Sequence, residues 1–205
     1  MSLTFYYAPM TSATRIHWAL EELGVPYEKV KLDLAAGDQK KPEYLALNPN
    51  GKVPLLVDSG TPIFESLAIL LHLGETYGVE KGLFPVPGLE RAEVFKWMAW
   101  GTASLVEAGG RLLRNTSDRF PAEERNAKAA ERAKQELGDL MAIVDKALEG
   151  KEYLVGGRFS FADLAVVGFV PFLSRIGADL GSLKNVQACA GRCMARPALA
   201  RAMQG

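Results

Sequence analysis

Apolar and polar positions near the start of the chain follow a strand pattern and then a helix pattern. The stretch "LTFYY" at residues 3–7 is aromatic and β-branched, which predicts a strand. The stretch "SATRIHWALEELG" follows, with apolar residues at helical spacing and a glycine as its stop. Next, "YEKVKLDL" alternates as a second strand. This β-α-β order predicts two parallel strands joined by a right-handed crossover.

Four further elements, namely a helix, the two strands of a hairpin and a last helix, complete this part of the chain. The stretch "KPEYLAL" predicts a short helix, and "PLLVDSGTPIF" predicts a hairpin that turns through Ser59 and Gly60. A last helix is expected to begin near Glu65. The order β-α-β-α-β-β-α therefore predicts an α/β domain with a four-stranded mixed sheet and helices on its faces.

The pattern changes to helical after a segment rich in proline and glycine. We expect residues 1–79 to form the α/β domain, residues 80–88 to form a linker, and residues 89–205 to form an all-helical domain. The first long helix of that domain contains Gly109-Gly110, which should weaken or bend it. The next helix is expected to start at Pro121.

A strong local folding signal lies in the stretch "RFSFADLAV". Ser160 followed three positions later by Asp163 predicts a capping box at the start of a helix. The stretch that follows has almost no polar face, so this helix should lie at the centre of its domain. Pro171 should bend it.

Composition and charge narrow the class of partner. Of 205 residues, 48% are hydrophobic and 23% charged, which suits a protein that folds around its own core. The 24 basic residues balance the 24 acidic ones, so the charge favours neither nucleic acid nor an anionic membrane. A small neutral or zwitterionic ligand remains open. No leader or membrane span is evident, so we expect a cytoplasmic protein.

Cysteine and histidine give no sign of a metal site. Cys189 and Cys193 are four residues apart in a predicted helix and resemble small core residues more than a disulfide or metal pair. His17 and His72 are far apart in the sequence. We therefore predict no metal.

Several motifs together resemble the glutathione S-transferase superfamily, in its bacterial cytosolic form. The stretches "NPNGKVPLL", "ESLAILLHL", "YYAPMTSATRIHWALEELGVPYE" and "FSFADLAV" are similar to motifs of that family, with matching spacing over the whole chain. The resemblance implies a thioredoxin-like first domain with a cis-proline after Val53, and glutathione as co-substrate. It also implies a homodimer in which the first domain of one subunit meets the second domain of the other.

The resemblance also implies a glutathione site, for which the residue chemistry is suitable. The N–H and C=O of Val53 could pair with an extended peptide as one more strand. A helix start near Glu65 suits a carboxylate, and the Glu65 side chain suits an ammonium group, although these residues could simply cap the helix. The implied glutathione-binding residues are Gln39, Lys52, Val53, Pro54, Glu65 and Ser66.

A hydroxyl near the first helix is the implied activator of the glutathione thiol. A donor to the sulfur favours the thiolate and lowers the thiol's pKa. The candidates are Ser12, then Thr11, then Tyr6, although Ser12 and Thr11 could be ordinary helix caps. Without a cysteine in "TSATR", disulfide reductase activity is disfavoured, which leaves conjugation, isomerisation or peroxide reduction.

The resemblance places a pocket for a small hydrophobic electrophile against the helical domain. The implied lining residues are Met10, Trp97, Trp100, Leu105 and Arg111, although an aromatic stripe at helical spacing is also typical of a core. Two classes of function therefore stand. The first is a detoxification-type glutathione transferase, and the second is a binding or regulatory protein that keeps the fold without the chemistry.

Overall fold

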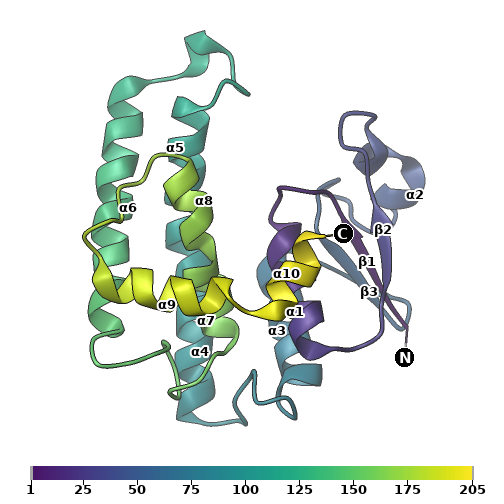
Figure 1. Cartoon of the computed structure of the whole chain (residues 1–205). Coiled ribbons are helices and arrows are strands. Elements are labelled where there is room, and N and C mark those ends of the chain that lie inside the picture. Colours follow the sequence, from purple (N-terminus) through teal and green to yellow (C-terminus); the bar gives the residue numbers. More distant parts are fainter. Residues whose placement is uncertain (1, 205) are drawn as a thin grey trace. The chain divides into compact units, whose positions relative to one another are not determined.

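A computed structural model describes residues 2–204 and contains two compact units. The first unit holds the sheet, and its strand order is β2-β1-β3-β4 (Figure 1). Strand β1 pairs in parallel with β2, and the pairs β1–β3 and β3–β4 are antiparallel. The predicted four-stranded mixed sheet is confirmed. The strands are β1 (Leu3–Tyr7), β2 (Glu28–Lys31), β3 (Leu55–Asp58) and β4 (Thr61–Phe64).

The helices of the first unit lie against the sheet in the order that the sequence predicts. They are α1 (Ala13–Leu23), α2 (Pro42–Leu45) and α3 (Ser66–Leu73), with a 3-10 turn at Asp38–Lys40 and a π-helical turn at Gly74–Gly78. Along β1, Phe5 and Tyr7 are buried, whereas Tyr6 between them points to the opposite face and packs with Tyr44 of α2. Each face of the sheet therefore has its own helical cover.

The segment predicted as a linker is anchored to the first unit by one aromatic ring. Phe84 is 1% exposed and lies over Gly74 and Gly78. A Cβ atom at Gly74 would lie 2.4 Å from the Phe84 ring, so only glycine allows this approach. The boundary between the two units falls after Pro85.

The end of the chain belongs to the first unit in the structure, although the sequence places it in the helical domain. Residues from Arg196 onward, with helix α10 (Pro197–Met203), group with residues up to Pro85. Arg196 donates two hydrogen bonds to Glu22 of α1, at 2.6 and 2.7 Å, and Arg201 donates to Glu21 at 2.7 Å. These charge-assisted bonds attach the C-terminal helix to α1.

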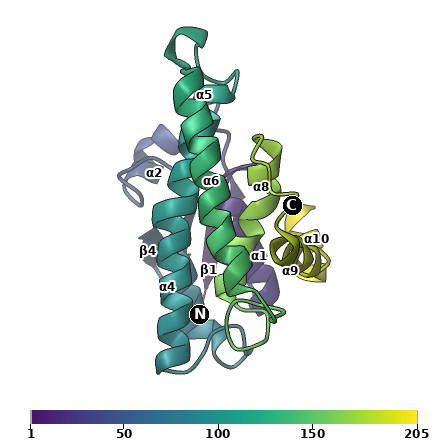
Figure 2. The same cartoon turned by 90° about the vertical axis from the view of Figure 1, so that its left-hand side faces the viewer.

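The second unit is built on two long antiparallel helical segments, which lie side by side in Figure 2. The first runs through α4 (Leu89–Trp100), a π-helical stretch at Gly101–Val106 and α5 (Glu107–Thr116). The bend predicted at Gly109-Gly110 was wrong, because both glycines lie inside α5 and the irregular backbone starts at Gly101. A Cβ at Gly109 would meet Leu173 at 3.2 Å, so this glycine permits close packing.

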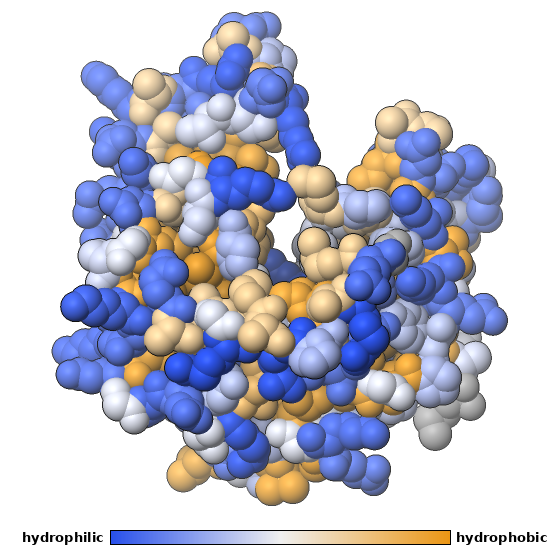
Figure 3. Space-filling view, in the orientation of Figure 1, coloured by the Kyte–Doolittle hydropathy of each residue, from blue (hydrophilic) through white to orange (hydrophobic). Residues whose placement is uncertain are grey.

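The second long segment begins later than predicted. Helix α6 (Ala127–Ala147) starts after Asn126, whose side chain accepts a hydrogen bond from the Ala129 N–H at 3.0 Å, and not at Pro121. Its exposed face carries charged residues, and hydrophilic side chains cover this part of the unit in Figure 3. The buried positions of α6 include Leu137, Met141 and Val144, which gives the helix one apolar face.

A buried helix with the predicted capping box lies at the core of the second unit. Helix α7 (Phe161–Val166) is buried along its whole length, and both hydrogen bonds of the Ser160–Asp163 box are present. The helix then breaks into a 3-10 turn at Val167–Phe169 before α8 (Val170–Arg175), which places Pro171 in the first turn of a new helix. Helix α9 (Lys184–Met194) carries the buried Cys189 and Cys193, neither of which forms a disulfide.

No helix in the described range 2–204 is both long enough and apolar enough to span a bilayer.

Candidate functional site

The loop between β1 and α1 places two hydroxyl groups at the start of a helix, and they have different partners. Thr11 donates its hydroxyl hydrogen to the carbonyl of Ala8 at 2.8 Å and accepts from the Ala13 N–H at 3.2 Å. Its hydroxyl therefore closes the loop. Ser12 holds the N-cap position of α1 but makes no side-chain cap bond. The Ser12 hydroxyl lies at the positive end of the helix dipole and is free of any capping role.

The Ser12 hydroxyl faces the backbone that precedes β3. Its Oγ lies 3.5 Å from the carbonyl oxygen of Val53, a residue 41 positions away in the sequence. That distance is at the limit of a hydrogen bond, so the hydroxyl is weakly engaged. The peptide bond between Val53 and Pro54 is cis. The structure therefore brings together the start of α1 and the Val53 backbone, which are two of the predicted site elements.

The backbone just before Val53 is held by two buried side chains. The Tyr44 hydroxyl donates to the carbonyl of Lys52 at 2.6 Å, and the Asn48 amide nitrogen donates to the same oxygen at 2.7 Å. Burial raises the pKa of the Tyr44 phenol, so this hydroxyl remains a hydrogen-bond donor. The Lys52 side chain is exposed.

The start of α3 supplies the third predicted element. Glu65 has φ 72° and ψ 119°, an uncommon conformation for a residue other than glycine, and its side chain is exposed and makes no cap bond. Ser66 is the first residue of the helix and is half-buried. With eight residues, α3 presents free backbone N–H groups at this end, which suit a carboxylate.

Gln39 lies close to the turn that leads to Val53. A Cβ at Gly51 would lie 2.9 Å from the Gln39 carbonyl oxygen and 2.8 Å from the Lys40 ammonium, so the 3-10 turn and the Gly51 backbone are in close contact. Gln39 donates from Nε2 to the Leu34 carbonyl at 3.4 Å. Its Oε1 is buried, and no residue that the structure describes gives it a hydrogen bond. The sequence did not single out Lys40, although it is the charged group nearest to Gly51.

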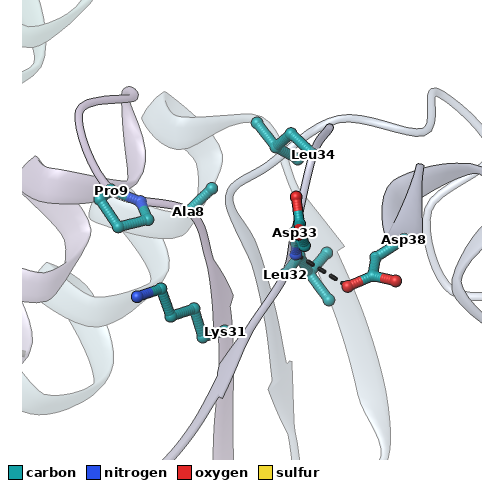
Figure 4. A pocket seen from close by; sticks show the side chains of 7 residues that line it. All are labelled: Ala8, Pro9, Lys31, Leu32, Asp33, Leu34 and Asp38. Carbon is teal, nitrogen blue, oxygen red and sulfur yellow. Dashed lines mark hydrogen bonds between the residues drawn. The ribbon is translucent and has the colours of Figure 1, made fainter. Parts of the chain in front are cut away.

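A pocket of about 440 Å³ lies beside the β1–α1 loop (Figure 4). Its lining residues are Ala8, Pro9, Lys31, Leu32, Asp33, Leu34 and Asp38. The Asp33 N–H donates to the Asp38 carboxylate at 2.8 Å, which stiffens the wall formed after β2. The neighbouring Lys41, 2.8 Å away, lowers the pKa of Asp38. Because β2 and β3 flank β1 on opposite sides, this pocket and Val53 lie on opposite sides of the β1–α1 loop.

Tyr6, the third candidate hydroxyl, has a packing role. Its ring meets the Tyr44 ring edge-on with centroids 5.8 Å apart, and it packs on the cluster of Leu32, Tyr44 and Leu55. Tyr6 therefore lies on the sheet face that α2 covers, whereas α1, which begins after Ser12, packs on the other face.

The predicted electrophile pocket is not gathered in one place within either unit. Met10 is 61% exposed on the β1–α1 loop of the first unit. In the second unit, Leu105 is fully buried, and Arg111 is held in ion pairs with Glu107 and Glu136. The assignment of Met10, Leu105 and Arg111 to a substrate pocket stays a prediction.

The two tryptophans line a groove of the second unit. Trp97 and Trp100 pack edge-on with ring centroids 5.4 Å apart. They border a depression of about 400 Å³ together with Ile143 of α6. This groove lies between α4 and α6, so it is separate from the core around Leu105.

The histidines take structural positions. His17 is buried among the rings of Phe5, Tyr7 and Tyr27, and burial lowers its pKa. His72 bonds to the Asp58 carboxylate at 2.8 Å. Within residues 2–204, no group of three or more acidic, histidine or cysteine side chains is arranged to hold a metal ion.

Comparison with known proteins supports the family. Models of the "Glutathione S-transferase, N-terminal domain" and the "Glutathione S-transferase, C-terminal domain" match residues 1–75 and 105–197. The chain is 35% identical to glutathione S-transferase F10 of Arabidopsis thaliana over 178 residues, which is 84% of this chain and 81% of that protein. It is 33% identical to the disulfide-bond oxidoreductase YfcG of Escherichia coli strain K12, over 98% and 94% of the two chains.

A solved structure has the same fold. The glutathione transferase of Burkholderia graminis, solved with two glutathione molecules per subunit, superposes with a TM-score of 0.89 at 28% identity. The match covers 100% of this chain and 88% of that chain.

Proposed function

Since the chain belongs to the glutathione S-transferase superfamily, we propose that it binds glutathione and uses its thiolate as a nucleophile. One observation carries this proposal: the Ser12 hydroxyl lies 3.5 Å from the Val53 carbonyl. A peptide that pairs with the Val53 backbone would have its cysteinyl sulfur beside that hydroxyl and the start of α1. The site then has a place for the peptide and a donor for its sulfur.

Each end of glutathione has a suitable group nearby. The α-carboxylate of the γ-glutamyl end suits the backbone N–H groups at Ser66, and the Glu65 carboxylate suits the ammonium group. The glycyl carboxylate suits the amide of Gln39 and the ammonium of Lys52. In this arrangement Pro54 shapes the turn and Val53 supplies the backbone pairing.

The proposed chemistry is the activation of a thiol. A free cysteine-type thiol has a pKa near 8.5 and is mostly protonated at neutral pH. The Ser12 hydroxyl donates to the sulfur, and the N-terminus of α1 adds positive potential, so both favour the thiolate. The thiolate then attacks an electrophilic carbon, a carbon–sulfur bond forms, and the leaving group departs with the electron pair of the bond that breaks. We rank Ser12 above Thr11, since the Thr11 hydroxyl is already used within the loop.

A second activity, reduction of disulfides by two glutathione molecules, has support from the relatives. One relative is named a disulfide-bond oxidoreductase, and one structural neighbour holds two glutathione molecules per subunit. One glutathione thiolate attacks the substrate disulfide, which releases one thiolate and leaves a mixed disulfide with glutathione. The second glutathione thiolate attacks that mixed disulfide, releasing the other thiolate and forming oxidised glutathione.

This second activity would need no cysteine in the protein. The lack of a cysteine in "TSATR" disfavours reduction through a protein thiol, but here both thiols come from glutathione.

The test compares two substrates on one preparation. Glutathione binding is measured by calorimetry, and turnover is then followed with an aryl halide and with a small dialkyl disulfide. Conjugation of the halide supports the transferase, and oxidised glutathione formed from the disulfide supports the reductase. Binding without turnover of either would favour the alternative, a non-catalytic binding or regulatory protein. No binding at all would refute the proposal.

We further propose that the protein is a cytoplasmic homodimer. Cys189 and Cys193 form no disulfide, which suits a reducing compartment. Closed two-fold dimers are the commonest assembly of soluble oligomers, and the family resemblance points the same way. Sedimentation at micromolar concentration tests this, and a monomer there would contradict it.

A further inference from the structure

The carbonyl of Lys52 accepts hydrogen bonds from two side chains, one on α2 and one in the turn after α2. The Tyr44 hydroxyl and the Asn48 amide donate to it at 2.6 and 2.7 Å. Both donors are almost completely buried, with Tyr44 4% and Asn48 2% exposed. A buried donor that loses its acceptor is costly, so this pair holds the carbonyl firmly.

The two donors are themselves fixed in place. The Asn48 side-chain oxygen accepts from the Asn50 N–H at 3.1 Å, and the Asn48 backbone N–H donates to the Tyr44 carbonyl at 2.8 Å. The Gly51 N–H donates a hydrogen bond to the Asn48 carbonyl at 2.9 Å. The Tyr44 ring rests against Tyr6. The turn from Tyr44 to Lys52 is therefore closed by its own hydrogen bonds.

The two hydrogen bonds to the Lys52 carbonyl also set the direction of the Val53 N–H. The Lys52–Val53 peptide is trans, and in a planar trans peptide the C=O and N–H point in opposite directions. A carbonyl held toward Tyr44 and Asn48 thus directs the Val53 N–H away from both. No described residue accepts a hydrogen bond from this N–H, whereas the Val53 carbonyl has Ser12 within 3.5 Å.

We propose that Tyr44 and Asn48 are positioning residues. They direct the Val53 N–H toward the bound ligand, and their own side chains do not contact that ligand. This inference rests on the proposed function, because the ligand that receives the N–H is glutathione. Because the Val53 N–H is already fixed, binding does not carry the entropy cost of ordering the protein backbone at this position. The pair of side chains should therefore act on affinity more than on the chemical step.

The test removes each donor and compares it with a matched control. Tyr44→Phe deletes one hydroxyl and keeps the ring contacts, and Asn48→Ala deletes the other donor. The control is Tyr27→Phe, which deletes a hydroxyl that donates to Glu21 at 2.6 Å, at the other end of α1. Glutathione Kd, glutathione KM, kcat and Tm are measured for all of them.

The expected result is a split between binding and turnover. Each single variant should raise the glutathione Kd and KM about threefold to tenfold, the range for one hydrogen bond, with kcat at saturating glutathione nearly unchanged. The double variant should raise the glutathione Kd by more than the product of the two single-variant increases, because in each single variant the remaining donor still holds the carbonyl. Tyr27→Phe should lower Tm about as much as Tyr44→Phe does, and it should leave the glutathione Kd unchanged.

Two results would overturn the inference. One is wild-type affinity in folded Tyr44→Phe and Asn48→Ala proteins, and the other is an equal loss of affinity in the Tyr27→Phe control. A wild-type protein that binds no glutathione refutes the proposed function instead. The positioning claim is then decided in the free protein by the NMR order parameter of the Val53 amide. It should fall in both variants and not in the control, and an unchanged order parameter would refute the claim.

Discussion

Substitution of Ser12 by alanine tests the proposed chemistry at a single oxygen. The Ser12 hydroxyl makes only a long contact with the Val53 carbonyl and no cap bond, so its removal should disturb the fold little. A hydrogen bond to a charged group contributes about 1.5–3 kcal/mol. At about 1.4 kcal/mol for each pKa unit, Ser12→Ala should raise the pKa of the bound glutathione thiol by about one to two.

The effect on rate follows from the thiolate fraction. With the hydroxyl, the thiol's pKa should lie near or below neutral, and without it the pKa should return toward about 8.5. The thiolate fraction at pH 7 then falls to a few per cent, so turnover should drop about tenfold. Activity depends on the anion and is lost as pH falls through this pKa. The acid limb of the rate profile should therefore move to higher pH in the variant.

The assay is an ultraviolet titration of thiolate absorbance for bound glutathione, with calorimetry to check affinity. Thr11→Ala is the matched control. The Thr11 hydroxyl donates to Ala8 and is not available to the sulfur, so this variant should leave the titration unchanged. If Ser12→Ala does not shift the titration, the thiolate is held by backbone donors and the helix dipole, and a serine catalyst is refuted. A shift in Thr11→Ala alone would transfer the role to that residue.

Further predictions concern binding and stability. Glu65→Ala should weaken glutathione binding by about 2–3 kcal/mol through loss of a charged partner, and unchanged calorimetric affinity would remove Glu65 from the site. Asp163→Ala should lower the free energy of unfolding by about 2–4 kcal/mol, because two buried backbone N–H groups lose their acceptor. Urea denaturation measures this loss, and a change below about 1 kcal/mol would contradict it. Arg196→Ala should cost about 1–3 kcal/mol by breaking the paired bonds to Glu22, and an unchanged Tm would show that α10 is held by packing alone.

The local signals in the sequence were sufficient for most of the fold. Strand alternation and helical spacing act over neighbouring residues, so the element order of the first unit was predictable. The Ser160–Asp163 box was predictable for the same reason, since its hydrogen bonds span three residues. The Gly109-Gly110 prediction failed because it used intrinsic propensity alone. At Gly109, close packing against Leu173 outweighs the helix propensity of glycine.

Ion pairs between residues far apart in the chain could not be predicted from the sequence. Arg196 and Arg201 bond to Glu22 and Glu21, which lie 174 and 180 residues away in the sequence. Nothing in the local pattern of α10 indicates that partner. The same limit applies to Arg111, whose ion-pair partner Glu136 lies 25 residues away in the sequence.

The site was predictable in part. The sequence named the hydroxyl candidates and ranked Ser12 above Thr11 by resemblance, but it could not show which hydroxyl the loop itself uses. Tyr44 and Asn48 were missed, although they lie eight and four residues from Lys52. The Asn48-Pro49 pair is a turn signal that could have drawn attention to this segment.

The most direct test of the account is an NMR titration of the labelled protein with glutathione, followed at the backbone amides. If glutathione pairs with the Val53 backbone and its γ-glutamyl carboxylate meets the start of α3, the amides of Val53 and Ser66 should shift most. The Val53 proton should move downfield as its N–H gains an acceptor. Saturable binding that leaves both amides unshifted, or no binding at millimolar glutathione, would contradict the account.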